Sequence, residues 1–318
     1  MRAVHVPEPG DTPELGEIPA PDVTPGHVLI RVKAAGLNPL DNVIAAGVLA
    51  GRFPYEYPVV LGRDAAGVVV AVGEGVGEVA VGQEVFGHIP LTAPLGAGTL
   101  AEYALLPADT VVPKPLGLDF VAAAAMPLAS AAAFAAVDQI DPRPGEVVLV
   151  NGATGGVGRY VVQLLARRGV RVVATGRPED VEALVALGAW AVVDHTAGPV
   201  APRIPGGVDA LVNLVGEADD IPLDAVRLGG RVATTTGAPT AADLESVGLT
   251  GSTVYARPLR EIVEPLAEQV ADGTLTADVY AVLPLDRATE GLAVLAAGKA
   301  RGKIVVTFDD AAARDGDR

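Results

Sequence analysis

Residues 147–158 read VVLVNGATGGVG, a short apolar run that passes directly into a glycine-rich turn. The β-branched run is typical of a strand buried in a parallel sheet, and a helical pattern follows through Val161 to Arg168. Small residues between a strand and a helix let the backbone approach a pyrophosphate, which the free N–H groups of the helix start attract. We therefore predict a dinucleotide site rather than an ordinary turn, although Ala153 replaces the first glycine of the usual fingerprint. The residues assigned to this site are Ala153, Thr154, Gly155, Gly156, Val157 and Gly158.

Strands and helices alternate on the C-terminal side of this turn. Strand-like runs recur at residues 170–174, 191–193, 210–214 and 231–235, and helical stretches separate them. This alternation predicts βαβ units and a doubly wound parallel sheet over residues 118–263.

Residues at the end of the second strand, about 20 residues after the turn, distinguish NAD from NADP in this type of fold. An acid there binds the ribose of NAD, but the strand ends in Thr175, Gly176 and Arg177. Arg177 is suited to pair with a 2′-phosphate, so the sequence favours NADPH. The alternative is that Arg177 is an exposed loop charge. Glu179 and Asp180, which follow Pro178, fit the first turn of a helix.

The N-terminal third of the chain has a different pattern. Short β-rich runs at residues 28–32, 67–72, 84–86, 100–106 and 110–112 are separated by glycine and proline. Such spacing predicts an irregular β-barrel. Near the C-terminus we expect a helix over 288–297, a strand over 303–308 and a disordered tail over 309–318.

Composition excludes several classes of protein. The 318 residues include 23 Lys and Arg, 39 Asp and Glu, and no cysteine, which gives a net charge of −16. Disulfides, a thiolate nucleophile and cysteine-ligated zinc are therefore excluded. The acidic balance argues against binding to nucleic acid or to anionic membranes. No signal peptide is apparent, and we expect the alanine-rich stretch 121–137 to be a buried helix of a cytoplasmic protein.

Several ordered blocks resemble one family. They are GLNPLD at 36–41, LGRDAAGVV at 61–69, VGQEVFG at 81–87, GTLAEY at 98–103, the turn at 151–158, LGA at 187–189 and GKIV at 302–305. Together they resemble the zinc-independent quinone oxidoreductase branch of the medium-chain dehydrogenase/reductase (MDR) superfamily. The resemblance implies an α/β fold with two domains and a homodimer. A discontinuous GroES-like β-barrel over 1–117 and 264–318 would flank a Rossmann doubly wound parallel sheet over 118–263.

The resemblance also implies chemistry without a metal. In zinc alcohol dehydrogenases a catalytic cysteine stands in the block that here contains Asn38, and a His-Glu pair stands where this chain has Arg63 and Asp64. The four histidines show no metal-ligand spacing. We therefore predict no metal site and a direct hydride transfer to a quinone or an α,β-unsaturated carbonyl.

Four further residues are candidates with alternatives left open. By resemblance, Asn38 contacts the nicotinamide or the substrate. Asp41 is a second catalytic candidate or a local cap of the helix after Pro39. Lys303 reaches the cofactor or is a solvated strand end. His195 stacks on adenine, reaches a phosphate, or is a loop residue.

Departures from the family leave the proton donor unassigned. A threonine common near the nicotinamide is replaced by Ala132, although Ser130 lies close by in sequence. No tyrosine has a lysine four residues later, which excludes a short-chain reductase. An enoyl reductase acting on a biosynthetic enone or thioester remains an alternative, as does a non-catalytic NADPH-binding sensor or structural protein.

Overall fold

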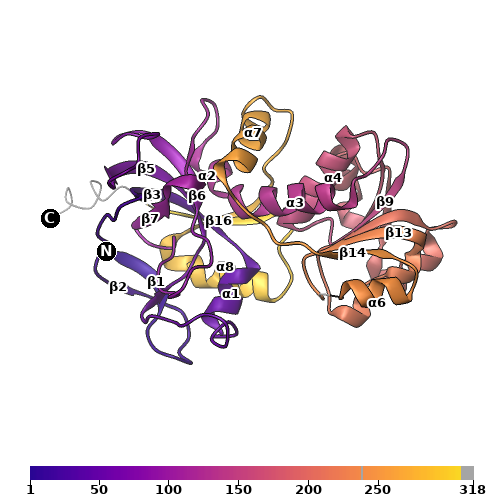
Figure 1. Cartoon of the computed structure of the whole chain (residues 1–318), viewed down its shortest axis with the longest axis horizontal. Coiled ribbons are helices and arrows are strands. Elements are labelled where there is room, and N and C mark those ends of the chain that lie inside the picture. Colours follow the sequence, from indigo (N-terminus) through magenta and orange to yellow (C-terminus); the bar gives the residue numbers. More distant parts are fainter. Residues whose placement is uncertain (238, 309–318) are drawn as a thin grey trace. The chain divides into compact units, whose positions relative to one another are not determined.

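The structure is a computed structural model that describes residues 1–237 and 239–308 (Figure 1). The described residues form two compact units. One contains Met1–Leu128 and the described residues from Pro258 onward, and the other contains Ala129–Arg257. The domain limits expected from the sequence, at 117/118 and 263/264, remain a prediction. The predicted disordered tail, 309–318, lies outside the described residues.

The first unit is built on a seven-stranded sheet with the order β15-β16-β3-β5-β6-β8, in which β7 also pairs with β3. Its strands are β3 (His27–Leu37), β5 (Asp64–Val72), β6 (Glu84–His88), β7 (Tyr103–Pro107), β8 (Val112–Pro113), β15 (Val279–Pro284) and β16 (Lys303–Thr307). A small sheet, in the order β2-β1-β4, comprises β1 (Arg2–Val6), β2 (Glu14–Glu17) and β4 (Val59–Val60). The antiparallel pairing of β16 with β3 shows that the C-terminal segment completes the N-terminal sheet, as expected.

Short helices surround this sheet. They are α1 (Pro39–Ala45), α2 (Phe120–Ala124), α7 (Arg260–Ala271) and α8 (Ala288–Ala296), with the 3₁₀ turns η1 (Ala108–Thr110) and η7 (Leu285–Arg287). Pro39 opens α1, a position where its missing N–H costs nothing. Helices α1 and α8 lie side by side in Figure 1, and Asn42 Nδ2 donates to the Leu292 carbonyl at 3.0 Å.

The second unit contains six strands, all parallel, in the order β11-β10-β9-β12-β13-β14. They are β9 (Val147–Asn151), β10 (Arg171–Gly176), β11 (Ala191–Asp194), β12 (Val208–Asn213), β13 (Val226–Thr234) and β14 (Thr250–Thr253). The helical elements are α3 (Pro127–Ile140), which begins in the first unit, α4 (Gly156–Arg167), α5 (Val181–Ala186), α6 (Ala241–Ser246) and the turns η2 (Pro178–Asp180), η3 (His195–Ala197), η4 (Ala201–Arg203), η5 (Ala218–Asp220) and η6 (Leu223–Ala225). Strand order reverses at β9, which confirms the predicted doubly wound sheet.

Some predicted boundaries were wrong. The run 110–112 was expected to be a strand, but residues 108–110 form a 3₁₀ turn and β8 has only two residues, because the flanking prolines and Asp109 favour a turn. The alanine-rich stretch forms two helices, α2 and α3, divided just before Pro127. Over the residues that the structure describes, no helix is long and apolar enough to cross a membrane.

Candidate functional site

The predicted strand–turn–helix is present in the second unit. Strand β9 ends at Asn151, and α4 begins at Gly156 with Gly155 as its N-cap. Gly152 has a φ of +85°, a left-handed conformation that glycine adopts without strain. Its N–H donates to the Thr175 hydroxyl at 2.9 Å, so the end of β10 holds the turn in place. The N–H groups at the start of α4 therefore lie at the carboxyl end of the parallel sheet, where such folds bind ligands.

Two glycines of the turn have different roles. A Cβ on Gly158 would lie 2.3 Å from the Gly152 carbonyl oxygen and 2.7 Å from Ala153 Cα. Gly158 therefore lets α4 pack directly on the turn. A Cβ on Gly155 would meet that same oxygen only at 3.5 Å, an ordinary contact. The side of the turn at Gly155 thus has room for an approaching group.

Polar side chains link the ends of four neighbouring strands. The Thr175 hydroxyl donates to Asn151 Oδ1 at 3.1 Å, Asn151 Nδ2 donates to Asn213 Oδ1 at 2.8 Å, and Asn213 Nδ2 donates to the Thr234 hydroxyl at 3.3 Å. These residues are buried. The sequence analysis missed this network, although β9, β10, β12 and β13 each end in or beside an asparagine or a threonine. The network fixes the edge of the sheet on which the glycine turn lies.

Arg177 and His195 lie on the same edge of the sheet. Both are exposed and follow directly after β10 and β11, respectively. The Arg177 N–H donates to Asp180 Oδ2 at 2.9 Å, so the predicted helical turn at Glu179 and Asp180 is observed. The structure thus brings every cofactor-binding candidate except Lys303 to one sheet edge. Their contacts with a cofactor remain a proposal.

The first unit contains a buried ionic cluster centred on Asp64, which we call the Asp64 cluster: Asn38, Asp41, Arg63, Asp64, His88 and Lys303. His88 Nδ1 lies 2.7 Å from Asp64 Oδ1, and the Leu128 N–H donates to the same oxygen at 3.2 Å. Burial alone would raise the pKa of Asp64, but the donors His88, Lys303 and Asn38 outweigh it and hold the pKa below its ordinary value. Asp64 is therefore an ionised carboxylate in the interior.

Lys303 is part of this interior. Its ammonium group donates to Asn38 Oδ1 at 2.6 Å, to the Leu37 carbonyl at 2.8 Å and to Asp64 Oδ2 at 3.5 Å. These three contacts match its three hydrogens. Burial lowers the pKa of Lys303, and the charges of Asp64 and Asp41 oppose that shift. The expected alternative of a solvated strand end is wrong, because Lys303 is only 4% exposed.

The Asn38 carboxamide is held at both ends. Its Nδ2 donates to Asp64 Oδ2 at 2.9 Å and to the Gly36 carbonyl at 3.4 Å, while its Oδ1 accepts from Lys303. An acid on one side and an ammonium group on the other leave only one orientation for the amide. The side chain therefore does not cap α1, although Asn38 is the N-cap residue.

Asp41 caps α1 instead. Its Oδ2 accepts the Asn38 N–H at 2.7 Å, the capping role that the sequence left open. Its Oδ1 is buried and has no hydrogen-bond partner among the described residues. Burial raises the pKa of Asp41 to about 6, against the opposing effects of the Asn38 N–H, Arg63 and Lys303. A catalytic role for Asp41 remains a proposal.

Two tyrosines of the first unit, and Ser130 from the sequence analysis, have simpler surroundings. Tyr55 and Tyr57 stack with ring centroids 5.9 Å apart, and the Tyr55 hydroxyl donates to the Ile44 carbonyl at 3.2 Å, which is a loop-packing role. Ser130 is fully buried, and its hydroxyl has no partner within the described chain. The sequence analysis considered His88 only as a possible metal ligand, because its contact with Asp64 depends on the pairing of β5 with β6.

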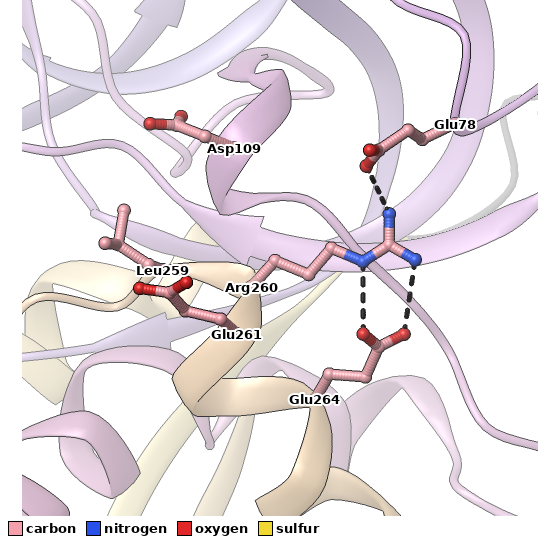
Figure 2. A pocket seen from close by; sticks show the side chains of 6 residues that line it. All are labelled: Glu78, Asp109, Leu259, Arg260, Glu261 and Glu264. Atoms are coloured by element: carbon pink, nitrogen blue, oxygen red, sulfur yellow. Dashed lines mark hydrogen bonds and ion pairs between the residues drawn. The ribbon is translucent and has the colours of Figure 1, made fainter.

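A surface pocket of about 610 Å³ lies elsewhere in the first unit (Figure 2). Its lining residues are Glu78, Asp109, Leu259, Arg260, Glu261 and Glu264. Arg260 binds Glu264 through two contacts of 3.2 and 3.3 Å and Glu78 at 2.5 Å. Its charge is thus already paired, and the pocket contains none of the residues predicted from the sequence. Across residues 1–237 and 239–308, no group of three or more His, Cys, Asp or Glu side chains is placed to hold a metal ion.

A GroES-like barrel sheet with a six-stranded Rossmann-type sheet and a glycine-rich turn defines a class of dinucleotide-dependent oxidoreductases. Family models agree: residues 24–116 match the alcohol dehydrogenase GroES-like domain, and residues 187–306 match a family described as zinc-binding dehydrogenase. The chain belongs to the MDR superfamily, in its quinone oxidoreductase and alkenal/one reductase-like branch, whose members lack zinc.

Individual relatives support this placement. The chain is 31% identical to 2-methylene-furan-3-one reductase of Solanum lycopersicum and 30% identical to the chloroplastic NADPH-dependent alkenal/one oxidoreductase of Arabidopsis thaliana. Each alignment covers 91% of this chain and 74% of the relative. A segment that makes up 5% of the polyketide synthase GfsB of Streptomyces halstedii is 34% identical over 92% of this chain. The solved quinone oxidoreductase from Coxiella burnetii superposes with a TM-score of 0.87 at 27% identity, covering 97% of this chain and 99% of that one.

Replacing Gly158 tests the close packing of the turn. We expect Gly158→Ala to lower the free energy of unfolding by about 1–3 kcal/mol, because the added Cβ overlaps backbone that cannot move aside freely. Gly155→Ala is the matched control and should change it by less than about 1 kcal/mol. Urea unfolding of both variants measures the difference, and equal losses would show that packing does not distinguish the two glycines.

The buried Asp41 carboxyl predicts a pH-dependent stability. A pKa raised from 3.8 to about 6 means that the folded protein holds the proton more tightly than the unfolded chain. Stability should therefore fall as pH rises from about 4 to about 6, by up to about 3 kcal/mol at 1.36 kcal/mol per pKa unit. Asp41→Asn should remove this loss, whereas Asp138→Asn, on an exposed carboxylate, should keep it. Unfolding curves at a series of pH values give the comparison; parallel profiles for wild type and Asp41→Asn would contradict the raised pKa.

Proposed function

We propose that this oxidoreductase reduces a quinone or an α,β-unsaturated carbonyl with NADPH by direct hydride transfer, without zinc. The observation that carries the proposal is the glycine turn between β9 and α4, braced by Thr175 at the carboxyl edge of the sheet. The space beside Gly155 and the first N–H groups of α4, which a helix leaves without intrahelical partners, fit a pyrophosphate. NADPH, when bound, supplies the hydride.

Residues of the chain would bind and orient the reactants. The turn from Ala153 to Gly158 would hold the pyrophosphate, Arg177 the 2′-phosphate, and His195 the adenine end. Asn38 would contact the nicotinamide or the substrate through a carboxamide whose orientation Asp64 and Lys303 fix. In this proposal Lys303 acts through Asn38, because its hydrogens are used in the interior. The homodimer implied by the family resemblance stays a prediction.

The substrate class rests on the relatives. Two of them are described as reductases of a methylene-furanone and of alkenals and alkenones, and the Coxiella protein as a quinone oxidoreductase. Quinones and enones share an electrophilic carbon conjugated to a carbonyl, so the same hydride step serves both. The polyketide synthase segment and the CurK enoyl reductase structure, at TM-score 0.84 and 26% identity, favour a second candidate: reduction of a biosynthetic enone or thioester.

A substrate panel tests the activity. Oxidation of NADPH is followed with quinones, with small enones and alkenals, and with an enoyl thioester. We expect turnover of the first two groups; turnover of the thioester alone would favour the enoyl reductase. Tight NADPH binding without turnover of any compound would leave the non-catalytic alternative and refute the proposed activity.

Cofactor preference has a separate test at Arg177. We expect Arg177→Ala to weaken NADPH binding about 10- to 100-fold while NADH binding stays unchanged, because a charge-assisted contact to the 2′-phosphate contributes about 1.5–3 kcal/mol. Arg171→Ala is the control, since Arg171 is an exposed arginine at the other end of the same strand. Titration of each variant with both cofactors gives the ratio. An unchanged ratio in Arg177→Ala would exclude the phosphate contact.

A further inference from the structure

Arg63 is the largest buried side chain of the Asp64 cluster and the one with unused donors. It is 1% exposed, and its Nε and Nη2 have no hydrogen-bond partner within residues 1–237 and 239–308. These two nitrogens lie on one edge of the guanidinium plane. Their N–H groups point in the same direction, so both can donate hydrogen bonds to one acceptor group. A buried donor pair without an acceptor is costly, so this edge is expected to face a group that is not part of the protein chain.

Asp41 offers an unused acceptor close to the same place. Its Oδ1 is buried and unpartnered in the described part of the chain, and Arg63 and Asp41 each shift the pKa of the other through their charges. The two side chains nevertheless form no direct hydrogen bond with each other through these atoms. The unused donors of Arg63 and the unused acceptor of Asp41 are thus suited to a small polar group rather than to a closed ion pair.

The charges of the cluster determine whether a carboxylate or a neutral carbonyl oxygen is the better partner for the Arg63 edge. Besides His88, which faces Asp64, the cluster contains two carboxylates, Asp41 and Asp64, and two cationic groups, Arg63 and Lys303. A carboxylate ligand would bring an additional negative charge into this buried region from the start, at a large desolvation cost. A neutral carbonyl oxygen brings none on binding. It becomes negative only as it is reduced, and a fixed cation then stabilises it most strongly.

We propose that the Nε/Nη2 edge of Arg63 binds the carbonyl oxygen of the substrate and holds the negative charge that reduction places on it. This inference rests on the proposed function and names a catalytic residue for it. Hydride from NADPH adds to the electrophilic carbon, the π electron pair moves to the carbonyl oxygen, and NADP⁺ remains. The resulting enolate then takes a proton from water, and the product formed from a quinone tautomerises to the hydroquinone. Because Arg63 is nearly fully buried, the oxygen reaches this edge only when the side chains that cover it move.

Two substitutions of Arg63 separate its charge from its shape. Arg63→Lys keeps the charge but loses the planar edge, and Arg63→Met loses both. We expect kcat to fall about 10-fold in the first and about 100- to 1000-fold in the second, the range for loss of an oxyanion donor, with NADPH affinity within about twofold of wild type. Arg52→Lys and Arg52→Met, at an exposed arginine, should leave kcat unchanged. Urea unfolding of Arg63→Lys verifies that the conservative variant is folded.

A binding measurement tests the same edge without turnover. 4-Nitrophenol changes its absorbance when it ionises, so it reports whether a site favours a phenolate oxygen. Wild-type protein should shift the bound compound toward the phenolate, Arg63→Lys should keep part of the shift, and Arg63→Met should lose it. Benzoate, a preformed carboxylate, should compete weakly. If the substrate panel shows no turnover, the proposed activity fails, but this measurement still tests Arg63.

Either of two results overturns the proposal. One is a wild-type kcat in both Arg63 variants. The other is the absence of any Arg63-dependent shift of 4-nitrophenol, in which case a buried water satisfies Arg63 and Asp41 and the edge has a purely structural role.

Discussion

The barrel unit depends on one buried carboxylate. Asp64 accepts hydrogen bonds from side chains on β6, β16 and the start of α1, and from the backbone N–H of Leu128 in the first turn of α3. A fully buried anion is tolerated only because these donors surround it. The same carboxylate satisfies a free N–H at a helix start, where negative charge is favoured. Removing it would leave Lys303 and Asn38 without their shared acceptor, so the geometry of the cluster follows from this residue.

The cluster occupies positions that are metal ligands in zinc-dependent members of the superfamily, according to the sequence resemblance. Arg63 and Asp64 replace a His-Glu pair there. The cluster contains two cationic side chains, Lys303, whose hydrogens all have partners, and Arg63, which has unused donors. The two cationic side chains therefore differ in their hydrogen bonding. All three hydrogens of Lys303 are bonded within the protein, whereas Nε and Nη2 of Arg63 can still bind a further acceptor.

The fold was predictable because strong local signals agreed. The β-branched run before Gly152 and the alternation after it specify a parallel sheet whichever way the rest of the chain folds. The glycine-rich turn followed from the same signals. The Asp64 cluster was not predictable, because Asn38, Asp64, His88 and Lys303 are far apart in sequence and meet only through strand pairing. Lys303 shows the reason most clearly: a lysine at a strand start is usually solvated, and only the register of β16 against β3 brings it inside.

The pairing of β16 with β3 also orders events during synthesis. Strand β3 is synthesised early. Its partner strand β16 begins at Lys303 and is synthesised only after every strand of the Rossmann-type sheet. Closing so long a segment costs chain entropy and slows formation of non-local sheets. Asp64 therefore has no ammonium partner until Lys303 has been synthesised. The ionic cluster can therefore close only after all six strands of the Rossmann-type sheet have been synthesised.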